Sequence, residues 1–154
     1  MVTGAKVKEE TWKLTSADTV AIPAANRSDG TANQWTDIWK YQVPVGQAHV
    51  LRPQHLLSAY LEDASTQVSN GTCQIKIVVR DQSEQDEKTI YGPALYVASK
   101  EFQDRDLMAT LGLKGDVIVE ERFFIVVMVK DDGAIDESDS YFNLEMIRVR
   151  RGIA

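Results

Sequence analysis

The chain has 154 residues, of which 44% are hydrophobic and 26% are charged, and its formal net charge at pH 7 is −6. This composition is typical of a folded globular protein and excludes the disordered, collagen-like and membrane-spanning classes. The acidic balance argues against a nucleic-acid binder, because the phosphate backbone is bound by clustered Lys and Arg side chains.

A single domain is the default at this length. The longest apolar run, residues 123–129, contains seven residues, whereas a membrane-spanning helix needs about 20. The N-terminal segment turns charged at Lys6, where a signal peptide would need its apolar stretch. We therefore expect a soluble chain, made in a cytoplasm, without a signal peptide and without membrane contact.

The first 34 residues differ in character from the rest. Small, polar and turn-forming residues dominate positions 15–33, which could not build a core of their own. Residues 6–14 could form a strand that adds to a sheet edge, either in the same subunit or in a neighbour. We predict an N-terminal arm over residues 1–34 and a β-sandwich domain over residues 35–154.

A period of two recurs along the chain. In residues 74–80, Ile75, Ile77 and Val79 alternate with polar side chains, as a half-buried strand requires. Residues 81–87 then read as a solvated hairpin loop, and residues 88–97 as the returning strand, bent at Gly92-Pro93.

Further strands are predicted upstream and downstream. They cover residues 35–43, 49–52, 54–62, 117–130 and 140–150. Helix is the competing interpretation for residues 54–62, where we favour strand. A short helix is plausible only at residues 99–113, with Ser99 as its cap.

About eight strands without alternating helices are typical of a sandwich or barrel. We predict an all-β fold, an antiparallel β-sandwich, with the jelly roll as the best-fitting eight-strand version.

Residues that carry out chemistry are scarce. The chain has two histidines, His49 and His55, and one cysteine, Cys73, too few for a zinc or iron site of the usual kind. We expect structural or surface roles for the histidines and core packing for Cys73. Common hydrolase and nucleotide-binding motifs are absent, so we predict a protein that is not an enzyme and has no cofactor. A β-sandwich enzyme with two paired carboxylates stays open, but no pair is preferred.

Residues 131–139 form the sharpest acidic cluster, with five acids and no base. Oxygen ligands in a loop suit a hard cation such as Ca²⁺, but the spacing is not that of an EF-hand. We favour a solvated hairpin tip and predict no metal site.

Residues 123–129 are apolar on both faces of the predicted strand. Phe124, Val126 and Met128 share one face, opposite Phe123, Ile125, Val127 and Val129. A sandwich strand covered only on its inner side would have one polar face. The second face therefore meets another element of the chain or another subunit.

All three tryptophans, Trp12, Trp35 and Trp39, lie in the first quarter of the chain. Trp35 and Trp39 are four residues apart and are expected to share one face of a strand. Core packing, an interface anchor and a sugar-stacking platform are all open for them. As an interface hypothesis we take these residues: Trp12, Trp35, Trp39, Phe124, Val126 and Met128.

The arm before Trp35, the strands of residues 35–150 and the two-faced apolar strand together resemble the small decoration, or cement, proteins of viral and phage capsids. The resemblance implies a structural virion protein that stabilises a shell without catalysis. It further implies a homo-oligomer, a homotrimer, that contacts a major capsid protein or similar shell protein and is located in the virion. The alternative is a carbohydrate-binding, lectin-like module that uses Trp35 and Trp39 as its stacking surface.

Overall fold

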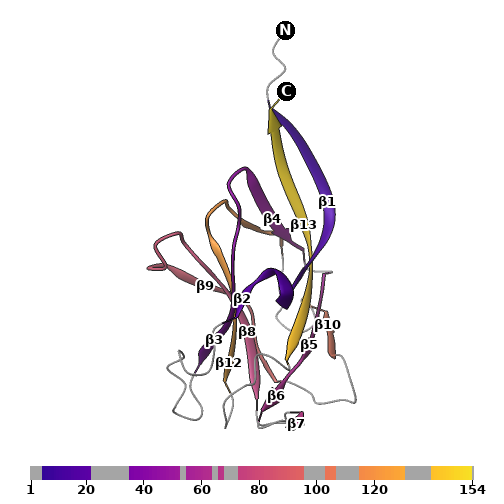
Figure 1. The fold of residues 1–154 in the computed structure, drawn as a ribbon, viewed down its shortest axis with the longest axis vertical. Coiled ribbons are helices and arrows are strands. Elements are labelled where there is room, and N and C mark those ends of the chain that lie inside the picture. Colours follow the sequence, from indigo (N-terminus) through magenta and orange to yellow (C-terminus); the bar gives the residue numbers. More distant parts are fainter. Residues whose placement is uncertain are drawn as a thin grey trace.

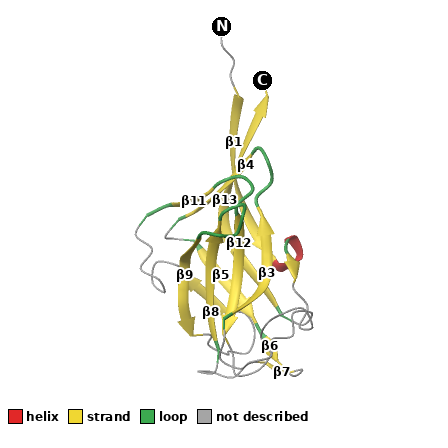
Figure 2. Cartoon of the chain, turned by 90° about the vertical axis from the view of Figure 1, so that its left-hand side faces the viewer, coloured by secondary structure: helices red, strands yellow, loops and turns green. Residues whose placement is uncertain are grey.

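The computed structural model describes residues 5–21, 35–52, 55–63, 66–67, 73–95, 103–106, 115–130 and 140–153. Within them, two antiparallel sheets face each other (Figure 1; Figure 2). Sheet A contains β1 (Ala5–Thr15), β4 (Gln47–Leu51), β5 (Leu56–Tyr60), β10 (Gln103–Asp106), β11 (Val117–Val119) and β13 (Tyr141–Ile153). Sheet B contains β2 (Val20–Ala21), β3 (Thr36–Gln42), β8 (Gln74–Arg80), β9 (Glu87–Leu95) and β12 (Phe124–Lys130). A small ribbon pairs β6 (Glu62–Asp63) with β7 (Thr66–Gln67), and Ser16–Asp18 form a single 3₁₀ turn.

The six strands of sheet A occupy four positions across the sheet, because two pairs of strands lie end to end. One edge of β13 pairs with β1 along its whole length, from Ala5↔Ile153 to Thr15↔Asn143. The other edge pairs first with β5 and then with β4, which therefore act as one long strand interrupted at residues 52–55. In the same way β10 pairs with β5 and β11 with β4. The order across sheet A is β1, β13, β4 with β5, and β11 with β10.

Sheet B has the order β3, β12, β8 and β9, with the short β2 added beside β3. Two facing sheets with four strand positions each, connected in this order, form a jelly roll. The predicted antiparallel sandwich and its jelly-roll version are therefore confirmed. No helix in the described part of the chain is long and apolar enough to span a bilayer.

The core lies between the inner faces of the two sheets. Trp39 of β3 packs against Phe142 of β13, with ring centroids 5.1 Å apart. Ile77, Ile125 and Leu144 beside them are also buried. These side chains alternate with outward-facing ones along their strands, so the period of two identified strands 74–80 and 140–150 correctly.

The predicted single strand over residues 117–130 is wrong, because the chain changes sheets within it. β11 belongs to sheet A and β12 to sheet B. A turn over residues 120–123 separates them, closed by a hydrogen bond from the Phe123 amide to the Glu120 carbonyl (3.2 Å), and Arg122 has a φ of 67°. Reciprocal bonds tie this turn to Val43 at the end of β3. The polar residues Glu120, Glu121 and Arg122 mark the position of the turn.

The helix predicted at residues 99–113 is wrong for Gln103–Asp106, which form β10 and pair with β5. The rest of that range lies outside the described residues. The strand preferred over helix at residues 54–62 is confirmed as β5. The predicted strand in the arm is also confirmed: β1 adds to a sheet edge of its own subunit. Residues 22–34 of the arm lie outside the described part.

The predicted hairpin between β8 and β9 is confirmed. The Asp81 amide donates to the Asp86 carbonyl (3.1 Å), and the register of β8 with β9 shifts opposite Gly92-Pro93, where the bend was expected. The peptide bond Gly92-Pro93 is cis.

Candidate functional site

The outer face of sheet B brings together four of the six residues of the interface hypothesis. Phe124, Val126 and Met128 of β12 lie on it, next to Trp35 and to Val78 of β8. We call these five residues the outer patch. Val78 and Val126 are fully buried and Met128 is 7% exposed, while Trp35 and Phe124 are half-buried.

Trp39 is not part of the outer patch, and the expectation that it shares a face with Trp35 is wrong. A β-bulge lies between the pairs Val127↔Trp39 and Met128↔Asp37, so Ile38 has no partner of its own on β12. Ile38 and Trp39 consequently both point into the core, and each is 1% exposed. An extra residue in one strand reverses the alternation beyond it. A stacking platform made of Trp35 and Trp39 therefore does not form.

Cationic side chains cover the outer patch from within the same chain. Lys76 Nζ lies 4.5 Å from the centre of the Trp35 ring, and Lys40 Nζ lies 5.4 Å from that of Phe124. Such cation–π contacts bury the alkyl stems of the lysines against the rings. The second apolar face of β12 is thus partly covered by elements of its own chain, and whether it also meets another subunit stays a prediction.

Arg80 organises the charges beside the outer patch. Its Nη1 and Nη2 donate to the two carboxylate oxygens of Asp37 at 2.6 and 2.8 Å, and its Nε donates to Glu87 at 2.8 Å. Hydrogen bonding to Asp37 raises the pKa of Arg80, so it stays cationic. Asp37 and Glu87 belong to the two strands that flank β12 and β8, so the network ties the outer face of sheet B together.

Trp12, the first residue of the interface hypothesis, lies at one end of the core between the sheets. Its ring centroid is 4.9 Å from that of His49 and 5.7 Å from that of Tyr41, and the Arg148 guanidinium lies 5.0 Å from its centre. Glu10 accepts hydrogen bonds from Arg148 (2.9 Å) and contacts Arg150 (3.0 Å). Trp12 is therefore brought together with a polar cluster and not with Trp35 or Trp39.

His49 is fully buried in this cluster, and its Nε2 lies 3.2 Å from the Tyr41 hydroxyl. Burial, with Arg148 nearby, lowers the pKa of His49 to about 4, and burial raises the pKa of Tyr41 to about 12. Both side chains are neutral near pH 7. The expected structural role of His49 fits this position inside the core.

The other residues considered for chemistry are separated. His55 Nδ1 accepts a hydrogen bond from the Arg52 amide (2.9 Å), and Cys73 is buried. Within the described residues no three side chains of the His, Cys, Asp or Glu type gather as a metal site. The acidic cluster at residues 131–139 lies outside the described part.

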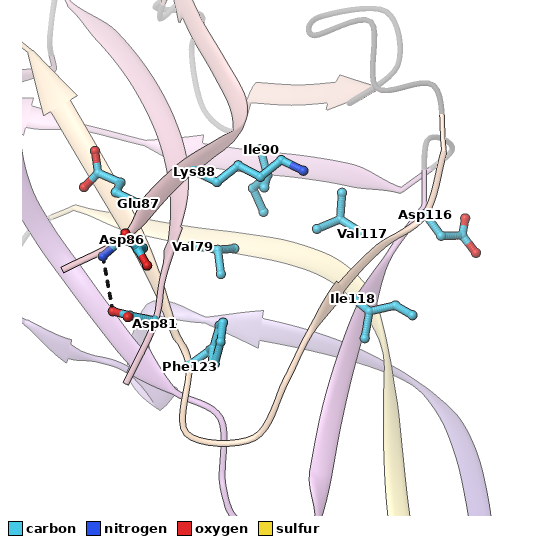
Figure 3. A pocket seen from close by; sticks show the side chains of 10 residues that line it. All are labelled: Val79, Asp81, Asp86, Glu87, Lys88, Ile90, Asp116, Val117, Ile118 and Phe123. Carbon is cyan, nitrogen blue, oxygen red and sulfur yellow. Dashed lines mark hydrogen bonds between the residues drawn. The ribbon is translucent and has the colours of Figure 1, made fainter. Parts of the chain in front are cut away.

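A cleft of about 520 Å³ opens between β9 and β11 at one side of the sandwich (Figure 3). Its apolar residues are Val79, Ile90, Val117, Ile118 and Phe123, and its charged residues are Asp81, Asp86, Glu87, Lys88 and Asp116. Ile118 is 60% exposed. Sequence reasoning missed this cleft, because its residues come from distant segments that lie close together only where the edges of the two sheets meet.

Comparison with solved structures adds the decisive observation about the fold. Over 98% of its length, the chain superimposes on the whole of VP17, a capsid protein of bacteriophage P23-77, with a TM-score of 0.58 and 6% sequence identity. The chain has the fold of a phage capsid protein. A second structure, the complex of VP16 and VP17, the two major capsid proteins of the same phage, matches 94% of the chain and 99% of the compared chain (TM-score 0.54, 7% identity).

The other comparisons add no function. No protein-family model matches the sequence, and no relative was found among curated protein sequences. A xylanase of Clostridium thermocellum that includes a carbohydrate-binding module matches with a TM-score of 0.34 over 26% of that chain, which is too weak to support an argument.

Proposed function

We propose that the chain is a structural protein of a viral capsid. One observation carries the proposal: the jelly roll superimposes on a phage capsid protein from end to end, over 98% of this chain and all of the other. A shared jelly roll alone would be weak support, since lectin domains and cupins have it too. Here the match extends over nearly the full length of both chains.

Within that role, the sequence favoured a decoration protein attached to a shell made by another protein. Two observations favour a subunit of the shell itself. The compared protein is described as one of two major capsid proteins. In addition, β1, which a decoration arm would extend to a neighbour, pairs along its whole length with β13 of its own chain. We therefore propose a shell subunit, with decoration as the alternative that the experiment must separate.

The proposed role is structural and needs no catalytic residues. His49 is buried and neutral, so it offers no base to a substrate in solution. Several charged side chains of the outer face are engaged in ion pairs, namely Lys40 with Glu84 and Arg80 with Asp37 and Glu87. This arrangement supports a protein that acts through its surfaces and its stability.

The test is the copy number and location of the chain in virus particles purified from its native source. Quantitative mass spectrometry and electron cryo-microscopy should find it at lattice stoichiometry. Deleting its gene distinguishes the shell subunit from the decoration protein. Loss of all particles supports a shell subunit, whereas intact but fragile particles support decoration. Absence of the chain from purified particles would overturn the proposal.

A further inference from the structure

β1 is an edge strand of eleven residues. Within the described residues it pairs only with β13, so its other edge takes part in no ladder there. At one end, β1 and β13 form a ribbon that projects beyond the body of the sandwich (Figure 1; Figure 2). An unpaired edge offers backbone N–H and C=O groups to an extended segment of another chain. The side chains of β1 decide which segment fits.

These side chains alternate between two environments. Glu9, Thr11 and Lys13 lie on the outer face of sheet A and are exposed. Trp12 and Leu14 point to the opposite face, where Leu14 is fully buried. The outer face of this edge therefore carries an acid two residues before Thr11 and a base two residues after it.

The edge of β1 is complementary in charge to a second copy of itself. When two identical strands pair antiparallel about a two-fold axis perpendicular to the sheet, inner and outer faces stay aligned, and one residue lies opposite its own copy. An axis at Glu9, Glu10 or Lys13 would place two like charges directly opposite each other, which is destabilising. An axis at Trp12 brings no opposite charges together. An axis at Thr11 places Glu9 of each copy opposite Lys13 of the other.

The register centred on Thr11 is therefore the favourable one. On the outer face, two symmetry-related pairs of Glu9 with Lys13 flank the two Thr11 side chains, and both kinds of cross-strand pair stabilise antiparallel strands. On the inner face Glu10 lies opposite Trp12, so no like charges meet there. Trp12, the residue of the interface hypothesis that belongs to β1, then lies beside the centre of the contact.

We propose that β1 of one copy pairs antiparallel with β1 of a second copy of this chain, with Thr11 at the two-fold axis. Sheet A of the two copies then continues as one sheet with the two β1 strands at its centre. The contact uses the same surface on both copies and is complete with two, unlike the homotrimer that the resemblance implies. The inference goes beyond the capsid role and does not rest on it, because the dimer is expected for the chain alone in solution.

Sedimentation velocity of the full-length chain over a concentration series tests the proposal. We expect an equilibrium between monomer and dimer. Glu9→Lys and Lys13→Glu should each weaken dimerisation at least about tenfold, because either change turns both attractive pairs into repulsive ones. The controls E120K and K88E make the same two charge changes at exposed positions away from β1 and should leave dimerisation unchanged. Unfolding curves verify that each variant is folded.

Exchanging the two charges distinguishes this register from a general effect of charge. In E9K/K13E opposite charges meet again with their positions exchanged, so dimerisation should return to within about threefold of the unchanged chain. An equal mixture of E9K and K13E should also dimerise, although neither variant does so well alone. A chain that stays monomeric at every attainable concentration, or a double variant as weak as the single ones, overturns the proposal.

A disulfide at the two-fold axis measures the register independently. Opposite Cα atoms of an antiparallel pair are about 4.5–5.5 Å apart, a distance that a disulfide spans. Thr11→Cys should therefore form a crosslinked dimer on oxidation, and Cys73 does not compete because it is buried. Glu9→Cys is the control and should not crosslink, since its two copies lie about 14 Å apart along the strands. Equal crosslinking of both variants contradicts the register.

Discussion

Arg80 and Asp37 form a two-point salt bridge on the outer face of sheet B, with Nη1 2.6 Å from Oδ2 and Nη2 2.8 Å from Oδ1. They are 43 residues apart in sequence and lie on β8 and β3, the two strands that flank β12. The Arg80 side chain is only 13% exposed, and one of its nitrogens also lies 3.8 Å from Met128 Sδ. The pair therefore clamps β12 from its outer side and covers part of the outer patch.

Replacing Arg80 by methionine should destabilise the fold, because Asp37 would keep its charge without its main partner. Bidentate and partly buried pairs are the stronger kind, but Asp37 remains 23% exposed and solvent screens it, so we expect a loss of about 1–2 kcal/mol. Urea denaturation measures this loss. Glu84→Gln, which removes a 3.4 Å contact to the same arginine and the 2.6 Å ion pair with Lys40, is the comparison variant and should cost less; an equal effect of both variants would contradict the clamp.

Trp39 and Trp35 should differ sharply in their contribution to stability. Trp39 is 1% exposed and packs against Phe142, so Trp39→Leu leaves a cavity in the core and should cost about 3 kcal/mol. Trp35 is half-buried on the outer patch, and Trp35→Leu should cost only about 1 kcal/mol. Chemical denaturation of both variants compares them. A larger loss from Trp35→Leu would show that the placement of the two rings is wrong.

Stability should fall as the pH is lowered from about 6.5 toward 4, because His49 is buried in its neutral form. Its pKa is about 4 in the folded chain and about 6.5 when unfolded. Between these values the unfolded chain binds more protons, so the free energy of unfolding decreases with falling pH, by about 3 kcal/mol at pH 4. Urea curves at several pH values measure the slope.

His49→Gln, which keeps a polar side chain but does not titrate, serves as the reference for that slope. Subtracting its curves removes the contribution of His55, whose pKa burial also lowers, and of the carboxylates. An identical pH dependence in the variant and the unchanged chain would refute the assignment to His49.

Glu10 should hold the projecting ribbon together. It bonds Arg148 and Arg150 of β13 across the pair with β1, so Glu10→Ala should leave both arginines without that partner. We expect faster amide hydrogen exchange in residues 5–10 and 148–153, with unchanged exchange in β8 and β12, since local opening depends on local contacts. Glu9→Ala, an exposed neighbour on the same strand, should leave the exchange rates of the monomeric chain unchanged.

The sequence was sufficient to predict the local conformation of most strands. Alternation of apolar and polar side chains is a property of neighbouring residues, and it identified β8 and β13 as well as the hairpin at residues 81–87. The number of strands and the lack of helical periodicity were likewise enough to predict an antiparallel sandwich. The strand order that makes it a jelly roll cannot be derived from such a pattern and was established by the structure.

Features of the candidate sites were less accessible from sequence. The outer patch was predicted as far as Phe124, Val126 and Met128, since two apolar faces on one strand are visible in the residues themselves. The partners of these side chains, Val78 and Trp35, come from other segments. The cleft between β9 and β11 gave no sequence signal, since it forms only where the last strands of two sheets meet.

Only the tertiary structure decided the direction of Trp39, the change of sheet after Val119 and the pairing of β1 with β13. The bulge at Ile38 exists because β3 must match β12, and one extra residue reversed the face of every side chain after it. What the sequence determined by itself was therefore the local alternation of each strand, because that depends on adjacent residues. Register, sheet membership and the cleft depend on contacts between segments far apart in the chain. They therefore cannot be predicted from the residues of any one segment.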